Sequence, residues 1–165
     1  VFWASTTTRD PKRNIYAART KDFRTFSEPF IYIEKPNLIL DATIIHDGNS
    51  YYRFIKDAKY NAITMEKSPA LNGPWTDVSG FNLARLEGFE GPTCFMIKPA
   101  SKDRPAVWAL ALDNYAKKGG YHVWVTDDLT SGVFKKDGDV SFPFKFRHGS
   151  VISLTAKEYA RLKTQ

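Results

Sequence analysis

A pattern that recurs three times is the strongest constraint on what this chain can fold into. Each copy is a strand-like run followed by a polar turn and then an aromatic residue. The copies are Ile15–Phe23 with Phe26, Ala62–Leu71 with Trp75, and Tyr121–Leu129 with Phe134. Aligned on Thr20, Lys67 and Thr126, they lie 47 and 59 residues apart. Repeats of this length, built from short strands, are typical of β-propeller blades. An irregular β-sandwich is the alternative, but its turns would not recur in this way.

The remaining local patterns predict an all-β chain with a short helical turn at its C-terminal end. The candidate strands are rich in β-branched and aromatic residues and are bounded by Gly, Pro, Asn and Asp. They are Val1–Thr7, Ile15–Thr20, Phe30–Glu34, Ala42–His46, Tyr51–Lys56, Ala62–Lys67, Thr93–Lys98, Ala106–Leu112, Tyr121–Thr126 and Ser150–Leu154. The segment His46–Ser50 predicts a tight hairpin because it contains Asp-Gly-Asn. Thr155 and Glu158 have the spacing of a helix-capping box.

The length of the chain predicts an incomplete propeller. At about 40–60 residues a blade, 165 residues hold roughly three blades, whereas a closed ring needs at least four. We therefore expect one partial propeller domain over residues 1–165, with approximate units 1–38, 39–86, 87–146 and 147–165. On this interpretation the chain is the later part of a longer domain.

Composition excludes several classes of protein. Hydrophobic residues make up 42% of the chain and aromatic residues 15%, which is too apolar for a disordered protein. A single cysteine, Cys94, excludes an internal disulfide framework. No apolar run reaches the roughly 20 residues that span a bilayer, and Val1–Ser5 lacks the features of a signal peptide. The net charge of +6 comes from dispersed basic residues, so we predict neither a nucleic-acid nor a membrane partner.

Two carboxylates precede apolar strands at similar places in successive units. Asp41 opens the run Ala42–His46, and Glu90 lies just before Thr93–Lys98, 49 residues further on. Equivalent positions on neighbouring blades would bring the two side chains together at one mouth of the central channel. Paired carboxylates in a partly dry cleft raise each other's pKa, which keeps one of them protonated as a general acid. A solvated carboxylate beside a turn is the alternative at each position.

The order of motifs resembles glycoside hydrolase family 43, whose members are five-bladed β-propeller arabinofuranosidases, arabinanases and xylosidases. The resemblance rests on Asp41–Ile44, Asp47-Gly48, Tyr51–Phe54 and Glu90-Gly91-Pro92, and it extends to Phe2–Thr6, Ile15–Phe23 and Arg147–Val151. It implies a five-bladed propeller and an inverting glycosidase with three catalytic carboxylates.

The resemblance implies a role for each of the two carboxylates. Glu90 would be the general acid, and Asp41 the carboxylate that modulates its pKa and orients it. Glu87 competes for the acid role, but only Glu90 is followed by Gly-Pro. The general base of the family lies in a first blade with no counterpart here, and Asp10, in a loop, is not assigned to it. We therefore expect little turnover from these 165 residues alone, and the missing N-terminal part of the same propeller as a partner.

Three further residues are candidates for contacts in the site. By resemblance, His148 would help to hold a hydrated structural calcium ion near the propeller axis; a histidine hydrogen-bonded within a strand is the alternative. Arg147 is a candidate for binding a sugar hydroxyl or is a surface residue, and Lys56 either faces the pocket or is a solvated strand end. No cofactor is expected to be required.

The predicted function is an inverting glycoside hydrolase that cleaves arabinofuranosyl or xylosyl linkages in plant-type polysaccharides or oligosaccharides. Its partner would be a carbohydrate substrate, and the polymeric substrates of the family imply an extracellular or periplasmic location. The alternative is a non-catalytic propeller module that binds carbohydrate or protein. Spacings typical of a zinc protease or of a serine nucleophile elbow are absent from the sequence.

Overall fold

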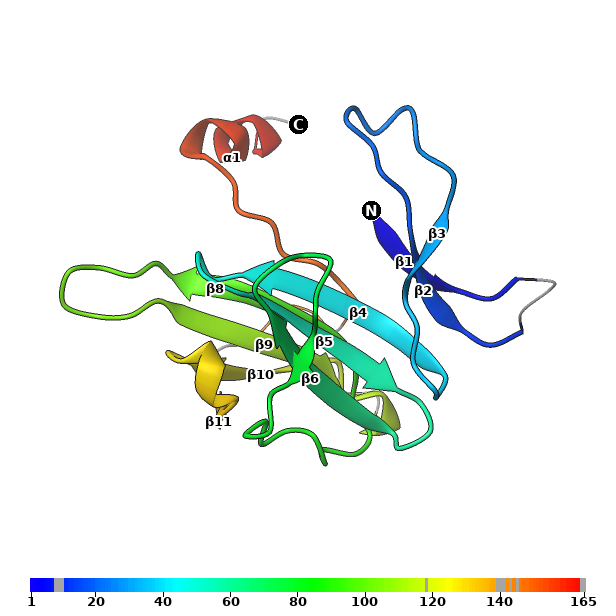
Figure 1. Ribbon diagram of the computed structural model, residues 1–165. Helices are drawn as coiled ribbons and strands as arrows, with labels where there is room; N and C mark the ends of the chain where they lie inside the picture. Colours follow the sequence, from blue (N-terminus) through cyan, green and yellow to red (C-terminus); the bar gives the residue numbers. More distant parts are fainter. Residues whose placement is uncertain (8–10, 118, 139–141, 143, 145, 164–165) are drawn as a thin grey trace.

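Three antiparallel sheets make up most of the molecule (Figure 1). The computed structural model describes residues 1–7, 11–117, 119–138, 142, 144 and 146–163. The first sheet contains β1 (Phe2–Ser5), β2 (Asn14–Ala17) and β3 (Phe30–Ile33). The second contains β4 (Ile39–His46), β5 (Tyr51–Asp57), β6 (Ala62–Ser68) and β7 (Thr76–Asp77). The third contains β8 (Glu90–Lys98), β9 (Val107–Asp113), β10 (Tyr121–Thr126) and β11 (Lys135–Lys136).

The all-β prediction is confirmed. The second and third sheets are four-stranded antiparallel meanders, in the orders β4-β5-β6-β7 and β8-β9-β10-β11, and such meanders are the units of propeller blades. No sheet closes on itself in the described part of the chain. The propeller and the unit boundaries therefore stay predictions.

The strand prediction included one segment that forms no strand, and it missed two short strands. Ser150–Leu154 has a β-type composition but forms no strand, since it makes no ladder pairing with a described strand. The strands β7 and β11 were missed because two residues are too few to produce an alternating pattern. Pairing with β6 and β10 creates them.

The terminal helix and the predicted hairpin both form. The helix α1 (Ala156–Leu162) begins after Thr155, whose hydroxyl accepts from the Glu158 N–H while the Glu158 carboxylate accepts from Thr155 N–H. None of its residues is buried, and Figure 1 shows it standing clear of the sheets. In the hairpin, the Asp47 N–H donates to the Ser50 carbonyl. No helix in the described residues is long and apolar enough to cross a membrane.

Side chains that alternate along the strands assign each face of the sheets to a different core. On β9, Trp108, Leu110 and Leu112 face the main core, which lies between the second and third sheets. Ala109 and Ala111, the intervening residues, face a smaller cluster on the other side. A further cluster, containing Ile15, Ile33, Ile39 and Ile55, joins the first sheet to the second. Central strands such as β9 are therefore buried on both faces.

A buried ion-pair network ties the second sheet to the segment that precedes it. The Arg53 Nε donates to Glu66 at 2.6 Å, and the Lys35 ammonium donates to the other Glu66 oxygen at 2.5 Å. The Arg53 guanidinium also stacks on the Trp75 ring, 4.2 Å from its centroid. Burial raises the pKa of Glu66, but the bonds from Arg53 and Lys35 outweigh burial and lower it overall.

We predict that Glu66→Gln destabilises the protein by about 3 kcal/mol near neutral pH, because it leaves Arg53 buried without its counter-charge. A lowered folded-state pKa contributes stability above the unfolded-state value of about 4.3, and that contribution is lost as the pH falls through the folded-state value. The difference in free energy of unfolding between wild type and variant should therefore become smaller at acidic pH. Urea unfolding at several pH values measures it.

The control is Glu34→Gln, which breaks the exposed Lys12–Glu34 pair and should cost less than about 1 kcal/mol. Equal losses in the two variants, or a Glu66→Gln loss that does not depend on pH, would contradict the prediction.

Candidate functional site

The first strand of the second sheet contains a β-bulge at Asp41. Leu40 pairs with Lys56 and Thr43 with Phe54, so that Asp41 and Ala42 together oppose one residue of β5. Asp41 has a φ of 48°, the left-handed conformation that the first residue of a G1-type bulge adopts. Asp tolerates this conformation better than most residues do. The bulge thus gives Asp41 a different direction from that of a regular strand residue.

The first strand of the third sheet contains the same bulge. Glu90 pairs with Asp113 and Thr93 with Ala111, which leaves Gly91 and Pro92 in the bulge. Gly91 has a φ of 58°, and a Cβ at this position would lie 3.1 Å from the ring of His148. A side chain here would be strained by the positive φ and would press against the His148 ring. The register also corrects the expected equivalence of Asp41 and Glu90: Asp41 matches Gly91, and Glu90 matches Leu40.

A third segment continues this pattern. His148 has a φ of 51° and, like Asp41 and Gly91, is the second residue of a four-residue motif that ends in a hydroxyl. The three motifs are Leu40-Asp41-Ala42-Thr43, Glu90-Gly91-Pro92-Thr93 and Arg147-His148-Gly149-Ser150. The third segment is tied to β8 and β10: the Thr93 hydroxyl donates to the Gly149 carbonyl at 2.5 Å, and the Gly149 N–H donates to the Tyr121 hydroxyl at 2.9 Å.

The three motifs bring their charged side chains together, since β4 and β8 lie side by side. His148 lies between two carboxylates, with Nε2 at 3.2 Å from Glu90 Oε1 and Nδ1 at 3.8 Å from Asp41 Oδ1. The Arg147 Nη2 donates to the same Glu90 oxygen. Asp41 Oδ2 accepts from the Gly91 N–H at 3.2 Å. Asp41, Glu90 and His148 each place a potential ligand atom within 4.8 Å of the other two.

A third carboxylate, Asp113, reaches the same cluster from β9. Its Oδ2 accepts from Arg147 Nε at 2.7 Å and lies 3.6 Å from His148 Nε2. The Asp113 side chain is only 1% exposed, whereas that of Arg147 is 58% exposed. The hydrogen bond to Asp113 raises the pKa of Arg147, with the charge of Glu90 contributing less.

Lys56 lies behind Glu90, buried between the two sheets. Its ammonium donates to the Phe89 carbonyl at 2.7 Å and to Asn61 Oδ1 at 2.5 Å. Asn61 also accepts from the Tyr115 hydroxyl at 2.7 Å. Burial lowers the pKa of Lys56, and the nearby carboxylates Glu90 and Asp41 partly oppose this effect. Lys56 is thus bound to the backbone just before Glu90 rather than exposed to the pocket.

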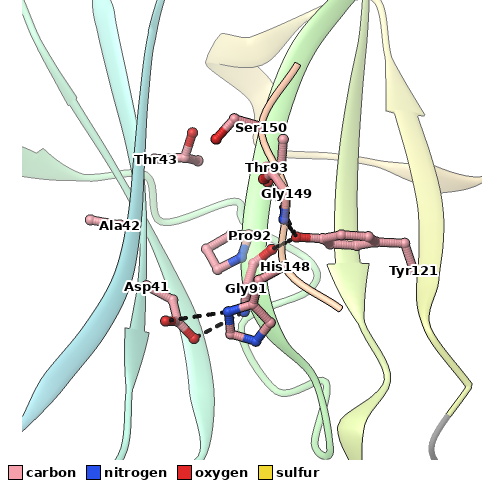
Figure 2. Close-up of a pocket in the computed structure, with 10 residues that line it drawn as sticks. All are labelled: Asp41, Ala42, Thr43, Gly91, Pro92, Thr93, Tyr121, His148, Gly149 and Ser150. Atoms are coloured by element: carbon pink, nitrogen blue, oxygen red, sulfur yellow. Dashed lines mark hydrogen bonds and ion pairs between the residues drawn. The ribbon is translucent and has the colours of Figure 1, made fainter. Parts of the chain in front are cut away.

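A polar pocket of about 120 Å³ opens beside this cluster (Figure 2). Asp41 and His148 face each other at one end, and hydroxyls from the last position of each motif, Thr43, Thr93 and Ser150, line it further along. Tyr121 approaches from β10, with its hydroxyl bonded to the Gly91 carbonyl at 2.9 Å. The volume holds several water molecules, and its lining can hydrogen-bond to a polar ligand.

Asp41 has a raised pKa. Burial is the largest cause, and the charge of Glu90 raises it further, while His148, the Gly91 N–H and Lys56 lower it. Asp41 therefore holds a proton more readily than a solvated aspartate would.

The sequence-predicted residues Asp41, Glu90, Arg147 and His148 are thus brought together, and Lys56 lies directly behind them. The competitor Glu87 lies exposed in a turn, and Asp10 is outside the described residues. Sequence reasoning missed Asp113 and Tyr121. One signal for Asp113 was present: a carboxylate directly follows the expected apolar strand Ala106–Leu112.

One comparison with known proteins identifies a relationship. A family model described as a probable glycosyl hydrolase domain, related to family 43, matches residues 1–160. No curated protein matches the chain. The match confirms the resemblance inferred from the motifs.

We predict that Asp41→Asn makes the protein more stable to urea at pH 7. A folded-state pKa above the unfolded-state value of 3.8 means that ionisation of Asp41 costs native stability as the pH rises. Asparagine keeps an acceptor for the Gly91 N–H without the charge. The difference in free energy of unfolding between variant and wild type should therefore decrease as the pH falls toward 4.

The matched comparison is Asp22→Asn, which should have the opposite sign. Asp22 has a lowered pKa because it accepts from the backbone N–H groups of Thr25 and Arg24, so its charge is favourable. A loss of stability at pH 7 in both variants would contradict the prediction for Asp41.

Proposed function

Because the chain belongs to the family of probable glycosyl hydrolase domains related to glycoside hydrolase family 43, we propose that it forms part of an inverting glycosidase active site. The observation that carries the proposal is the approach of Asp41 and Glu90 to within 4.8 Å beside a polar pocket. Glycoside hydrolysis needs a proton donor to the leaving oxygen, and such a pair can supply one near neutral pH.

In this proposal Glu90 is the general acid and Asp41 modulates its pKa. Glu90 is 20% exposed, enough for contact with a substrate, while Asp41 bonds to the Gly91 N–H next to Glu90. Asp41 thus lies close enough for its carboxylate to act electrostatically on Glu90.

The general base is proposed to come from another blade of a five-bladed propeller. In an inverting site the base lies about 6.5–9.5 Å from the acid so that water fits between them. Asp41 is too close to Glu90 for that role. Asp113 is 1% exposed and hydrogen-bonded to Arg147, so it is unsuited to activating water. Assays should accordingly use the full-length protein.

The proposed substrates are arabinofuranosyl or xylosyl linkages of plant-type polysaccharides or oligosaccharides, in an extracellular or periplasmic setting. This choice rests on the resemblance of the motifs to family 43. The pocket supports a polyhydroxylated ligand, since Thr43, Thr93 and Ser150 provide hydroxyls that both donate and accept. Arg147, with its side chain 58% exposed, is available to a sugar hydroxyl.

We predict that Glu90→Gln lowers kcat about 10²–10⁴-fold on substrates with poor leaving groups, because glutamine cannot donate a proton to the glycosidic oxygen. The measurement is hydrolysis of arabinofuranosides and xylosides by the full-length protein.

Glu87→Gln is the matched control, since Glu87 is exposed in a turn three residues earlier, and it should retain wild-type rates. Undiminished activity of Glu90→Gln would contradict the acid assignment. NMR of the first-formed sugar tests the stereochemistry, and retention of configuration would contradict the inverting mechanism.

A non-catalytic module that binds carbohydrate or protein is the second candidate function. The observation in its favour is that Arg147 and His148 both contact Glu90 Oε1, and cationic partners favour the ionised carboxylate over the acid. The two functions differ in one measurement. A binding module would retain oligosaccharide affinity without hydrolysis in wild type and Glu90→Gln alike.

A hydrated calcium ion beside His148 is also proposed, as a structural element rather than a required cofactor. Calcium prefers oxygen ligands, often through water, and the pocket offers the Asp41 carboxylate and three hydroxyls in addition to His148. The residues present therefore fit such an ion.

We predict that Ca²⁺ at ten times its Kd stabilises the protein by about 1.4 kcal/mol, which corresponds to a rise in Tm of about 3–6 °C. His148→Ala should abolish this rise, and His46→Ala, which alters an exposed histidine on β4, should retain it. Differential scanning calorimetry with and without chelator measures the effect. A rise of equal size in His148→Ala would contradict the proposed site.

A further inference from the structure

We propose that Asp113 is a positioning residue that holds Arg147 on Glu90 and so fixes which Glu90 oxygen is presented to the substrate. The inference rests on the proposed glycosidase function of the same site. Its starting point is the path of contacts from Asp113 Oδ2 to Arg147 Nε, and from Arg147 Nη2 to Glu90 Oε1. Arg147 thus bridges a buried carboxylate and the proposed acid.

Burying the Asp113 carboxylate at this position costs folding free energy. It is fully buried, its Oδ1 accepts no hydrogen bond from the described residues, and the rest of β9 is apolar. A buried carboxylate with one charged partner seldom adds stability over an apolar residue of similar volume. Stability therefore does not explain the presence of this carboxylate, whereas the positioning of Arg147 does.

Arg147 needs such an anchor. It lies in a segment that forms no strand, and its side chain is more than half exposed. A long exposed side chain loses considerable rotamer freedom when it is held in one geometry. The bond from Nε to Asp113 fixes the plane of the guanidinium, which lets Nη2 reach Glu90. A lysine would not fix both contacts in one plane, because its ammonium donors rotate freely at the end of a flexible stem.

The contacts that the described residues make with Glu90 fall on one oxygen. Arg147 Nη2 and His148 Nε2 both meet Oε1. Oε2 is therefore the oxygen left to carry the proton toward the glycosidic oxygen. If Arg147 is not held, the carboxyl group can rotate and proton delivery becomes less efficient.

Lys56, at the matching position on the second sheet, supports the positioning role of Asp113. Lys56 pairs with the first residue of the Leu40 motif, just as Asp113 pairs with Glu90. Lys56 bonds to the Phe89 carbonyl, one residue before the next motif, and Asp113 bonds to Arg147, the first residue of the motif after that. Each second strand thus supports the following motif with a buried charge.

The test is a double-mutant cycle with Asp113→Ala and Arg147→Ala in the full-length protein, measured on two substrates with the same sugar. One substrate has a dinitrophenyl leaving group, which departs with little protonation, and the other has an alkyl leaving group, which needs the acid. We expect Asp113→Ala to lower kcat on the alkyl substrate about 10–100-fold, less than the loss of the acid itself, and to change kcat on the dinitrophenyl substrate less than threefold. When Arg147 is already alanine, Asp113→Ala should change kcat on the alkyl substrate less than twofold.

Two further variants separate placement from folding. Arg147→Lys should behave as Arg147→Ala does, and it alters an exposed side chain that the fold does not need. Asp77→Asn, at the exposed end of β7, should leave both substrates unaffected. Equal losses on the two substrates, or effects of Asp113→Ala and Arg147→Ala that multiply, would overturn the proposal in favour of a structural role.

An NMR measurement separates this proposal from the proposed function. The Arg147 Nε–H signal, assigned by its absence in Arg147→Lys, should exchange slowly with water in wild type and become unprotected in Asp113→Ala. If wild type hydrolyses neither substrate but shows this protection, the glycosidase assignment fails while the anchoring of Arg147 stands. An unprotected Nε–H in wild type overturns the positioning role whatever the activity.

Discussion

The bulge shared by β4 and β8 is the constraint on which the site depends. A regular strand alternates its side chains between the two faces of a sheet, and the faces of these sheets are committed to the cores. The extra residue in each bulge, in the left-handed conformation, lets Asp41 leave this alternation and brings Glu90 next to it. The same geometry favours glycine at position 91, where a Cβ would lie 3.1 Å from the His148 ring. Backbone conformation thus determines which side chains can meet.

The charges in the site are arranged at a cost to stability. Three carboxylates approach His148, and burial raises the pKa of Asp41. Stability alone would favour fewer buried charges, as the apolar remainder of β9 illustrates. Elsewhere the same molecule pairs a buried charge fully: Glu66 has two cationic partners and a lowered pKa. The contrast between Glu66 and Asp41 separates a carboxylate whose charge is fully paired from one whose proton affinity is raised by burial.

The sequence predicted the fold class and much of the site because both depend on local signals. Alternating apolar residues predicted the long strands, and Glu90-Gly91-Pro92 together with Asp41 predicted the approach of two carboxylates. The exact equivalence of the two carboxylates was wrong by one residue, since the carboxylate is the second residue of the Leu40 motif but the first residue of the Glu90 motif. Asp113 was missed because its role depends on Arg147, which is 34 residues away along the chain. Contacts of that kind come from the packing of sheets and not from any pattern within a segment.

The two buried charges behind the motifs have opposite signs, and the groups that they hold explain this difference. Lys56 approaches a carbonyl oxygen, which only a donor can bind, and its charge also faces Glu90 and Asp41. Asp113 approaches a guanidinium, which only an acceptor can bind. Lys56 and Asp113 occupy matching positions of two similar sheets. The sign of the charge at this position therefore depends on the group that it binds in the next motif along the chain, and not on the sheet that contains the residue. It follows that the site is a property of neighbouring sheets packed together, and that the main core between the second and third sheets maintains the geometry of the proposed acid.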